Sequence, residues 1–95
     1  MLSGAGDFES FVSAISGQES GGNYDAVNGR TGASGKYQIM PGNWPNWSAE
    51  AGLPSDAPMT QENQEKVARF KLKQYYDKYG GERGGHSLVR WRGRT

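Results

Sequence analysis

A glutamate closes an apolar helical stripe near the start of the chain, in the stretch ISGQESGG from Ile15 to Gly22. Glu19 lies four residues beyond Ile15, on the same helical face, and two glycines follow Ser20. Burial and the negative end of the helix dipole both favour a protonated carboxyl group in this position. Glu19 is therefore a candidate general acid. Spacing alone leaves a second interpretation open, in which Glu19 faces solvent at a frayed helix end.

Two helices are predicted on either side of a glycine-rich segment. The first is capped by Asp7 or Ser3 and ends at Gly21-Gly22, and its apolar stripe consists of Phe8, Phe11, Val12 and Ile15. The second runs from about Thr60, its cap, to Tyr79, before Gly80-Gly81. Its stripe consists of Val67, Ala68, Leu72, Tyr75, Tyr76 and Tyr79.

Between these helices, residues 23–42 are rich in Gly, Asn, Ser and Thr, which predicts tight turns or a small hairpin forming the wall of a site. The stretch NWPNWSAEAGL then predicts a short helix that ends at Gly52. We expect Ile39 and Met40 in the core, together with at least one of Trp44 and Trp47.

The composition indicates one small folded domain over residues 1–95, because 34% of the 95 residues are apolar and 12% aromatic. There is no cysteine, which excludes disulfides and thiolate metal sites, and His86 alone cannot form a zinc site. We expect neither a metal nor a cofactor. We expect no signal peptide, because MLSGAGDFES has neither a basic nor an apolar region, and no apolar run in the sequence is long enough to span a membrane.

The net charge of +1 hides an asymmetry between residues 1–65, at −6, and residues 66–95, at +7. Such a basic segment can face nucleic acid, an anionic polymer such as the bacterial cell wall, or the acidic part of its own fold. We expect no nucleic-acid partner, because the lysines and arginines of residues 66–78 surround a tyrosine stripe that is expected in the core.

Two motifs are similar to those of lytic transglycosylase and lysozyme-like domains, including domains of phage tail and virion proteins. They are the pair Glu19-Ser20 at the end of an apolar helix and the pattern GxxGxxQIMP from Gly32 to Pro41. The resemblance covers about a third of the chain densely. It implies a mainly α fold of the α+β lysozyme-like type, a small helical domain whose Gly-rich turn or short hairpin lines a cleft. We expect a single domain of this type over residues 1–95, and the sequence leaves open whether it is truncated at its C-terminus or is a module of a larger protein.

The resemblance also implies an activity, cleavage of the β-1,4 bond between N-acetylmuramic acid and N-acetylglucosamine in peptidoglycan glycan strands. Glu19 would act as acid and then as base, which leaves a 1,6-anhydro product. A lysozyme-type hydrolase of the same bond is an alternative, although such enzymes ordinarily use two carboxylates. The nearest second acid, Asp25, is more simply explained as a turn residue in NYDAVNG. A further alternative is a non-catalytic peptidoglycan-binding module of the same fold.

Substrate-binding residues are also implied by the resemblance. Ser20 and Gln38 would line the cleft, with Tyr37 beside Gln38. Asn28 falls close to where some related enzymes place a serine before the glycine turn.

Two aromatic residues complete the predicted site. Tyr24 is a candidate for stacking against a sugar ring. Trp91, in VRWRG, stands where the family usually has a tyrosine in a segment such as AYNAG, and both its type and its spacing depart from that pattern. We expect the protein to act in the virion or outside the cell, at the cell wall.

Overall fold

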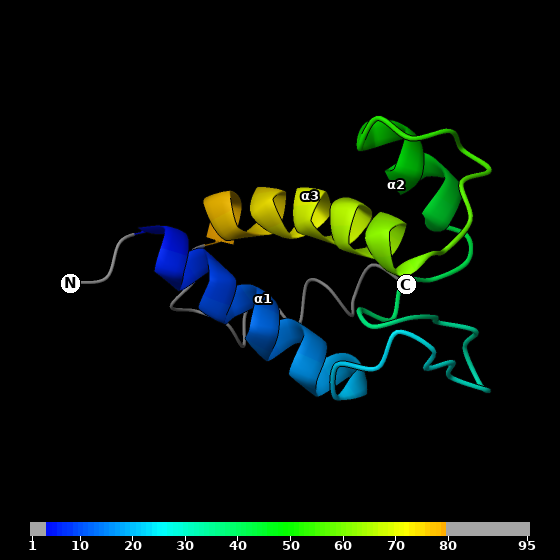
Figure 1. Cartoon of the computed structure of the whole chain (residues 1–95), viewed down its shortest axis with the longest axis horizontal. Helices are drawn as coiled ribbons and strands as arrows, with labels where there is room; N and C mark the ends of the chain where they lie inside the picture. The colour runs from blue at the N-terminus through cyan, green and yellow to red at the C-terminus, as the bar shows by residue number, and fades with distance from the viewer. Residues whose placement is uncertain (1–3, 80–95) are drawn as a thin grey trace.

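The structure, a computed structural model, describes residues 4–79. This part of the chain contains three helices joined by loops. They are α1 (Gly4–Ser20), α2 (Trp44–Glu50) and α3 (Gln61–Tyr79). Helices α1 and α3 pack against each other, and the short α2 packs against α3 (Figure 1). The prediction of a mainly α fold is confirmed.

Helix α1 ends where the sequence predicts, and it begins before Asp7, the later of the two predicted caps. It ends at Ser20, and Gly21 follows with φ 67°, in the left-handed region that glycine adopts without steric cost. The N–H groups of Gly21 and Gly22 donate to carbonyls of the last turns. The helix begins at Gly4, so the prediction of Asp7 as its cap is wrong: the helix continues one turn before the apolar stripe. Ser3 lies outside the described residues.

Helix α3 follows the prediction closely. Thr60 caps it, because the Thr60 hydroxyl accepts a hydrogen bond of 3.1 Å from the N–H of Asn63. The stripe residues Val67, Ala68 and Leu72 are completely buried. The helix continues to Tyr79, and the two glycines predicted to end it lie outside the described residues.

Helix α2 is the short helix predicted in NWPNWSAEAGL, with Pro45 in its first turn and Gly52 at φ 90° just after its C-cap. Both Trp44 and Trp47 are buried, which confirms the expectation of at least one indole in the core. The Trp44 indole N–H also donates a hydrogen bond of 2.7 Å to the carbonyl of Ala57. This bond attaches α2 to the segment that leads into α3.

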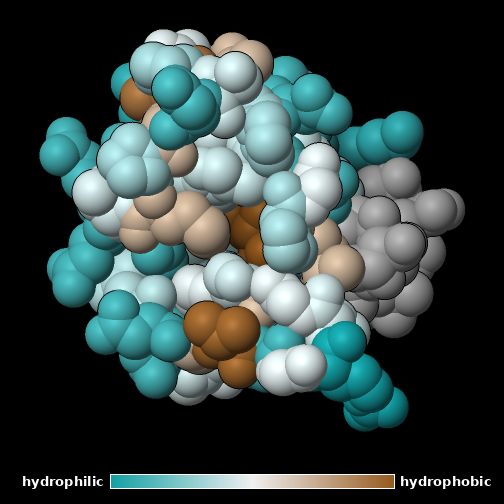
Figure 2. Space-filling view, turned by 90° about the vertical axis from the view of Figure 1, so that its right-hand side faces the viewer, coloured by the Kyte–Doolittle hydropathy of each residue, from teal (hydrophilic) through white to brown (hydrophobic). Residues whose placement is uncertain are grey.

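The glycine-rich segment between α1 and α2 is built from turns. Within residues 4–79 it forms two isolated antiparallel bridges, Val27 with Ser34 and Ser34 with Ile39, rather than strands. The segment leaves the end of α1 and passes below α2 (Figure 1). Figure 2 shows this end of the molecule, which is mostly hydrophilic and has a hollow with an apolar floor at its centre.

The core lies where the three helices and the glycine-rich segment meet. Its buried residues are Phe11, Val12, Ile15, Tyr37, Ile39, Trp44, Trp47, Val67, Ala68 and Leu72. Ile39 is in the core as expected, whereas Met40 is only half-buried, because it lies at the edge just before the exposed Pro41. No described helix is long and apolar enough to cross a membrane.

Two cations of α3 pair with acids from the N-terminal part of the chain. Arg69 holds the Glu9 carboxylate of α1 at 2.7 Å and 3.0 Å, and Lys71 pairs with Glu50 of α2 at 2.9 Å. For these residues, the charge asymmetry of the sequence serves contacts within the fold.

Candidate active site

Glu19 lies in the last turn of α1, one turn beyond the buried Ile15. Its side chain is half-buried, because the helix ends here and the two glycines that follow carry no side chain to cover it. Both of these glycines have positive φ, 67° and 84°. Glu19 thus lies at the end of α1, next to the glycine-rich segment, and is partly exposed to solvent.

Ser20 joins the end of α1 to the second motif. Its hydroxyl donates a hydrogen bond of 2.6 Å to the carbonyl of Lys36. The same oxygen accepts bonds from the N–H groups of Gly22 and Asn23, at 3.2 Å and 3.0 Å. Ser20 therefore fixes both the chain that leaves the helix and the distance between the helix and the turn at residues 35–38.

That turn is closed by its own backbone. Ser34 and Ile39 exchange two hydrogen bonds, of 3.0 Å and 2.9 Å, and Gly35 accepts from the N–H of Gln38 at 3.1 Å. Gly35 has φ 86° and Gln38 has φ 54°. A left-handed conformation at a residue other than glycine costs roughly 1–2 kcal/mol, so the surrounding contacts must hold Gln38 in it.

The amide of Gln38 supplies some of those contacts. The side chain is 7% exposed, and its nitrogen donates to the carbonyls of Gly35 at 3.0 Å and Ala26 at 3.3 Å. The residue predicted to bind substrate therefore also braces the loop around the turn.

Tyr24 and Tyr37 come together, although the sequence separates them by a dozen residues. Tyr37 is 1% exposed, so its ring belongs to the core, and Tyr24 is half-buried. Both hydroxyls donate to the carboxylate of Glu65 on α3, at 2.6 Å from Tyr24 and 2.8 Å from Tyr37.

Asn28 and Trp91 complete the predicted residues. Asn28 is exposed, and its side-chain oxygen accepts from the N–H groups of Arg30 and Thr31, which closes a local turn. Trp91 lies outside the described residues. The substrate-binding roles of all these residues stay predictions.

Glu65 is the residue that sequence reasoning missed. Besides the two tyrosines, it accepts from Lys36 at 2.6 Å and from Arg69 at 3.1 Å. Burial raises the pKa of its carboxyl group, but the four hydrogen bonds outweigh burial and bring that pKa down to about 2. Glu65 is thus an ionised centre that holds four side chains.

The partners of Glu65 are shifted in turn. The hydrogen bond to Glu65 raises the pKa of Tyr24 and that of Lys36, while burial and then the same carboxylate raise the pKa of Tyr37. The Lys36 ammonium lies 4.9 Å and 5.4 Å from the ring centroids of Tyr24 and Tyr37. The cation is therefore surrounded by two aromatic rings and one carboxylate.

A signal for Glu65 was present in the sequence. Glu65 lies three residues before Ala68 and seven before Leu72, so it extends the apolar stripe of α3 as Glu19 extends that of α1. The same spacing argument applied to α3 identifies it.

Gln64, beside Glu65, completes the attachment of the second motif to α3. Its side-chain oxygen accepts from the N–H of Lys36 at 2.9 Å, and its nitrogen donates to the carbonyls of Met59 and Tyr24. Gly35 lies directly against this amide, so that a Cβ at Gly35 would collide with it. The turn therefore rests on α3 at a position where glycine fits and a Cβ would have to displace the Gln64 amide.

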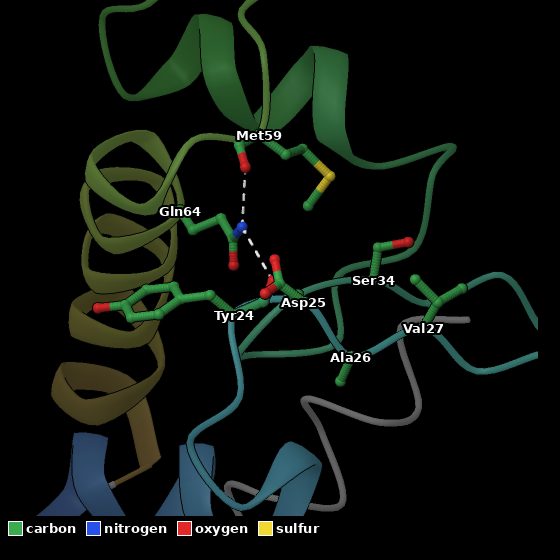
Figure 3. A pocket seen from close by; sticks show the side chains of 8 residues that line it. Tyr24, Asp25, Ala26, Val27, Ser34, Met59 and Gln64 are labelled. Carbon is green, nitrogen blue, oxygen red and sulfur yellow. Dashed lines mark hydrogen bonds between the residues drawn. The ribbon is translucent and has the colours of Figure 1, made fainter.

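A pocket of about 240 Å³ opens beside this attachment. Figure 3 shows the Gln64 amide on one side, between the carbonyls of Met59 and Tyr24, with Val27 and Ser34 on the other side. The exposed carboxylate of Asp25 also lines it. Apolar walls with a few polar groups are typical of sites for small molecules and parts of polymers.

No group of three His, Cys, Asp or Glu side chains within residues 4–79 is arranged to hold a metal ion. The carboxyl group of Glu19 can supply proton transfer, and a polar turn lies next to the end of its helix.

The family model described as "Transglycosylase-like domain" matches residues 8–83. This range contains Glu19, the turn at residues 35–38 and α3 up to its end. No curated protein and no solved structure matches the chain.

Proposed function

The chain belongs to the transglycosylase-like domain family, and we propose that it cleaves the β-1,4 bond between N-acetylmuramic acid and N-acetylglucosamine, with Glu19 as its catalytic residue. Membership indicates a peptidoglycan-related glycosidase of the transglycosylase type. The observation that carries the proposal for Glu19 is its position: half-buried in the last turn of α1, beside a serine bound directly to the second motif.

In the proposed reaction, Glu19 moves two protons. As an acid, it protonates the oxygen of the leaving sugar while the bond from that oxygen to the anomeric carbon breaks. As a carboxylate, it then takes the proton from the 6-hydroxyl of the muramic acid residue, whose oxygen attacks the anomeric carbon. A 1,6-anhydro ring closes, no water is consumed, and Glu19 is again protonated.

The other described carboxylates near the motifs give less support to a two-carboxylate hydrolase. Glu65 is held by Lys36 and Arg69 and by two tyrosine hydroxyls, so it is neither a free nucleophile nor a free base. Asp25 is exposed at the pocket. A single carboxyl group that transfers both protons fits this arrangement better than a pair that flanks the bond.

The pocket beside the turn supports the proposal as a place for part of the substrate, because it offers apolar surface together with a few polar groups. We also propose that the protein acts on the cell wall as part of a virion or from outside the cell, since peptidoglycan is accessible from there.

Mass spectrometry of digested peptidoglycan tests the reaction. Products that are lighter by one water than the ordinary reducing muropeptides are expected. Reducing products would instead identify a hydrolase, and binding to insoluble wall without any released product would identify a non-catalytic module.

A further inference from the structure

Three groups of Lys36 form an ion pair or a hydrogen bond with residues of two different helices. Its ammonium pairs with Glu65 at 2.6 Å, and its backbone N–H donates to the side-chain oxygen of Gln64 at 2.9 Å. Its carbonyl accepts the 2.6 Å hydrogen bond from Ser20. Lys36 therefore connects α3 to the last turn of α1, which contains Glu19.

Glu65 is the partner of Lys36 on α3, and it is also connected to α1 through a second side chain, that of Arg69. Arg69 donates to Glu65 at 3.1 Å and holds both carboxylate oxygens of Glu9, in the first half of α1. One route leads through Lys36 to the C-terminal end of α1, and the other through Arg69 to its N-terminal half. Together they fix α1 along its length relative to α3.

We propose that Glu65 is a positioning residue for the reaction of Glu19, acting through the side chain of Lys36 and the hydroxyl of Ser20. The inference rests on the proposed function and adds a residue outside both sequence motifs. Removal of the Glu65 charge would free the Lys36 ammonium, loosen the turn, and with it the carbonyl that Ser20 binds. Displacement of a reacting group by about 1 Å from a distant change can cost a hundredfold in rate.

The first experiment compares Glu65→Gln with a matched control on the same helix. Asp77→Asn breaks the exposed ion pair of Lys73 with Asp77, which is 2.8 Å long and far along α3 from the turn. On soluble glycan strands, Glu65→Gln is expected to lower kcat by about 10- to 100-fold and leave KM within about twofold, whereas Asp77→Asn keeps both. Equal kcat in the two variants would overturn the inference.

Variants at Lys36 test the route and guard against a Glu65 variant that does not fold. Lys36→Met is expected to lower kcat as Glu65→Gln does, and Lys36→Arg, which keeps a cation, to recover most of the loss. A Lys36→Met variant with the kcat of the wild type would contradict the proposed route.

A double-mutant cycle separates positioning from general stability. If Glu65 acts through Ser20, the combination of Glu65→Gln with Ser20→Ala loses little more kcat than the larger of the two single losses. If the two losses multiply, the residues act independently and the inference fails.

A spectroscopic measurement keeps the inference separate from the proposed function. Backbone amide signals of residues 19–22 are expected to shift in Glu65→Gln and not in Asp77→Asn. If the wild type releases no product, the proposed function fails, and these signals still decide whether Glu65 positions the last turn of α1. Unchanged signals in Glu65→Gln overturn the inference.

Discussion

The hydroxyl of Ser20 donates a hydrogen bond of 2.6 Å to the carbonyl of Lys36, which lies sixteen residues further along the chain. Ser20 belongs to the first sequence motif and Lys36 to the second, so this hydrogen bond joins the two motifs. The last turn of α1, which contains Glu19, is thereby attached to the turn at residues 35–38. This contact gives a physical reason why the two motifs occur in one chain.

Replacing Glu19 by Gln is expected to lower kcat by about 1,000-fold or more, because the amide can neither protonate the leaving oxygen nor remove the second proton. Muropeptide release measures kcat, and co-sedimentation with insoluble wall measures binding, which is expected to persist. Glu62→Gln, on the exposed first turn of α3, is the control. Undiminished turnover in Glu19→Gln would remove Glu19 as the catalytic acid.

Two glycine variants separate backbone strain from collision. Gly52→Ala is expected to lower the free energy of unfolding by about 1–2 kcal/mol, because φ is 90° there and the space for a Cβ is open. Gly35→Ala has a similar φ of 86° and in addition meets the Gln64 amide, so it is expected to lose at least about twice as much. Urea denaturation gives both values. Equal losses would mean that Gln64 moves aside without cost.

The decrease in the free energy of unfolding at acid pH is expected to depend on Glu65. Its pKa is about 2 in the folded protein, against an ordinary value of 4.5, so the unfolded chain binds more protons between these values. The contribution of Glu65 is therefore complete above pH 4.5 and is lost as the pH falls towards 2. Denaturation at a series of pH values is expected to show a smaller loss in this window for Glu65→Gln. Parallel curves for variant and wild type would contradict this explanation.

Two buried serines are expected to respond differently to alanine. The Ser48 hydroxyl is completely buried and has no hydrogen-bond partner within the part of the chain that the structure describes. Ser48→Ala removes this unsatisfied group and is expected to raise the free energy of unfolding by about 1 kcal/mol. Ser16→Ala, also in a helix, loses a 3.1 Å bond to the carbonyl of Ser13 and is expected to gain less. A loss of stability in Ser48→Ala would show that the hydroxyl is satisfied after all.

The helices were predictable because their signals are local. The spacing of Phe11, Val12 and Ile15 defines the face of α1 that is buried, and Thr60 caps α3 as expected. Glycine at Gly21 marks the end of α1, because the chain turns there through a left-handed conformation. Each of these signals depends on residues less than two turns apart.

The surroundings of the site were less predictable, because they depend on contacts between distant segments. Glu65 collects side chains from Tyr24, Lys36 and Tyr37, up to 41 residues away, and periodicity contains no information about such partners. The motif identified Gln38 as important, yet its bonds to two backbone carbonyls became visible only in the structure.

The turn that begins at Asn28 offers a practical opening. Its side-chain oxygen and its carbonyl accept hydrogen bonds from within residues 30–32, and Asn28 to Thr31 are exposed. A turn that is closed by its own hydrogen bonds can change in length without pulling on the helices, which is how surface loops tolerate insertions. A fluorophore or a short peptide tag attached at Gly29 or Arg30, beside the predicted substrate-binding residue Asn28 and exposed, would follow the protein on cell walls without moving the acid.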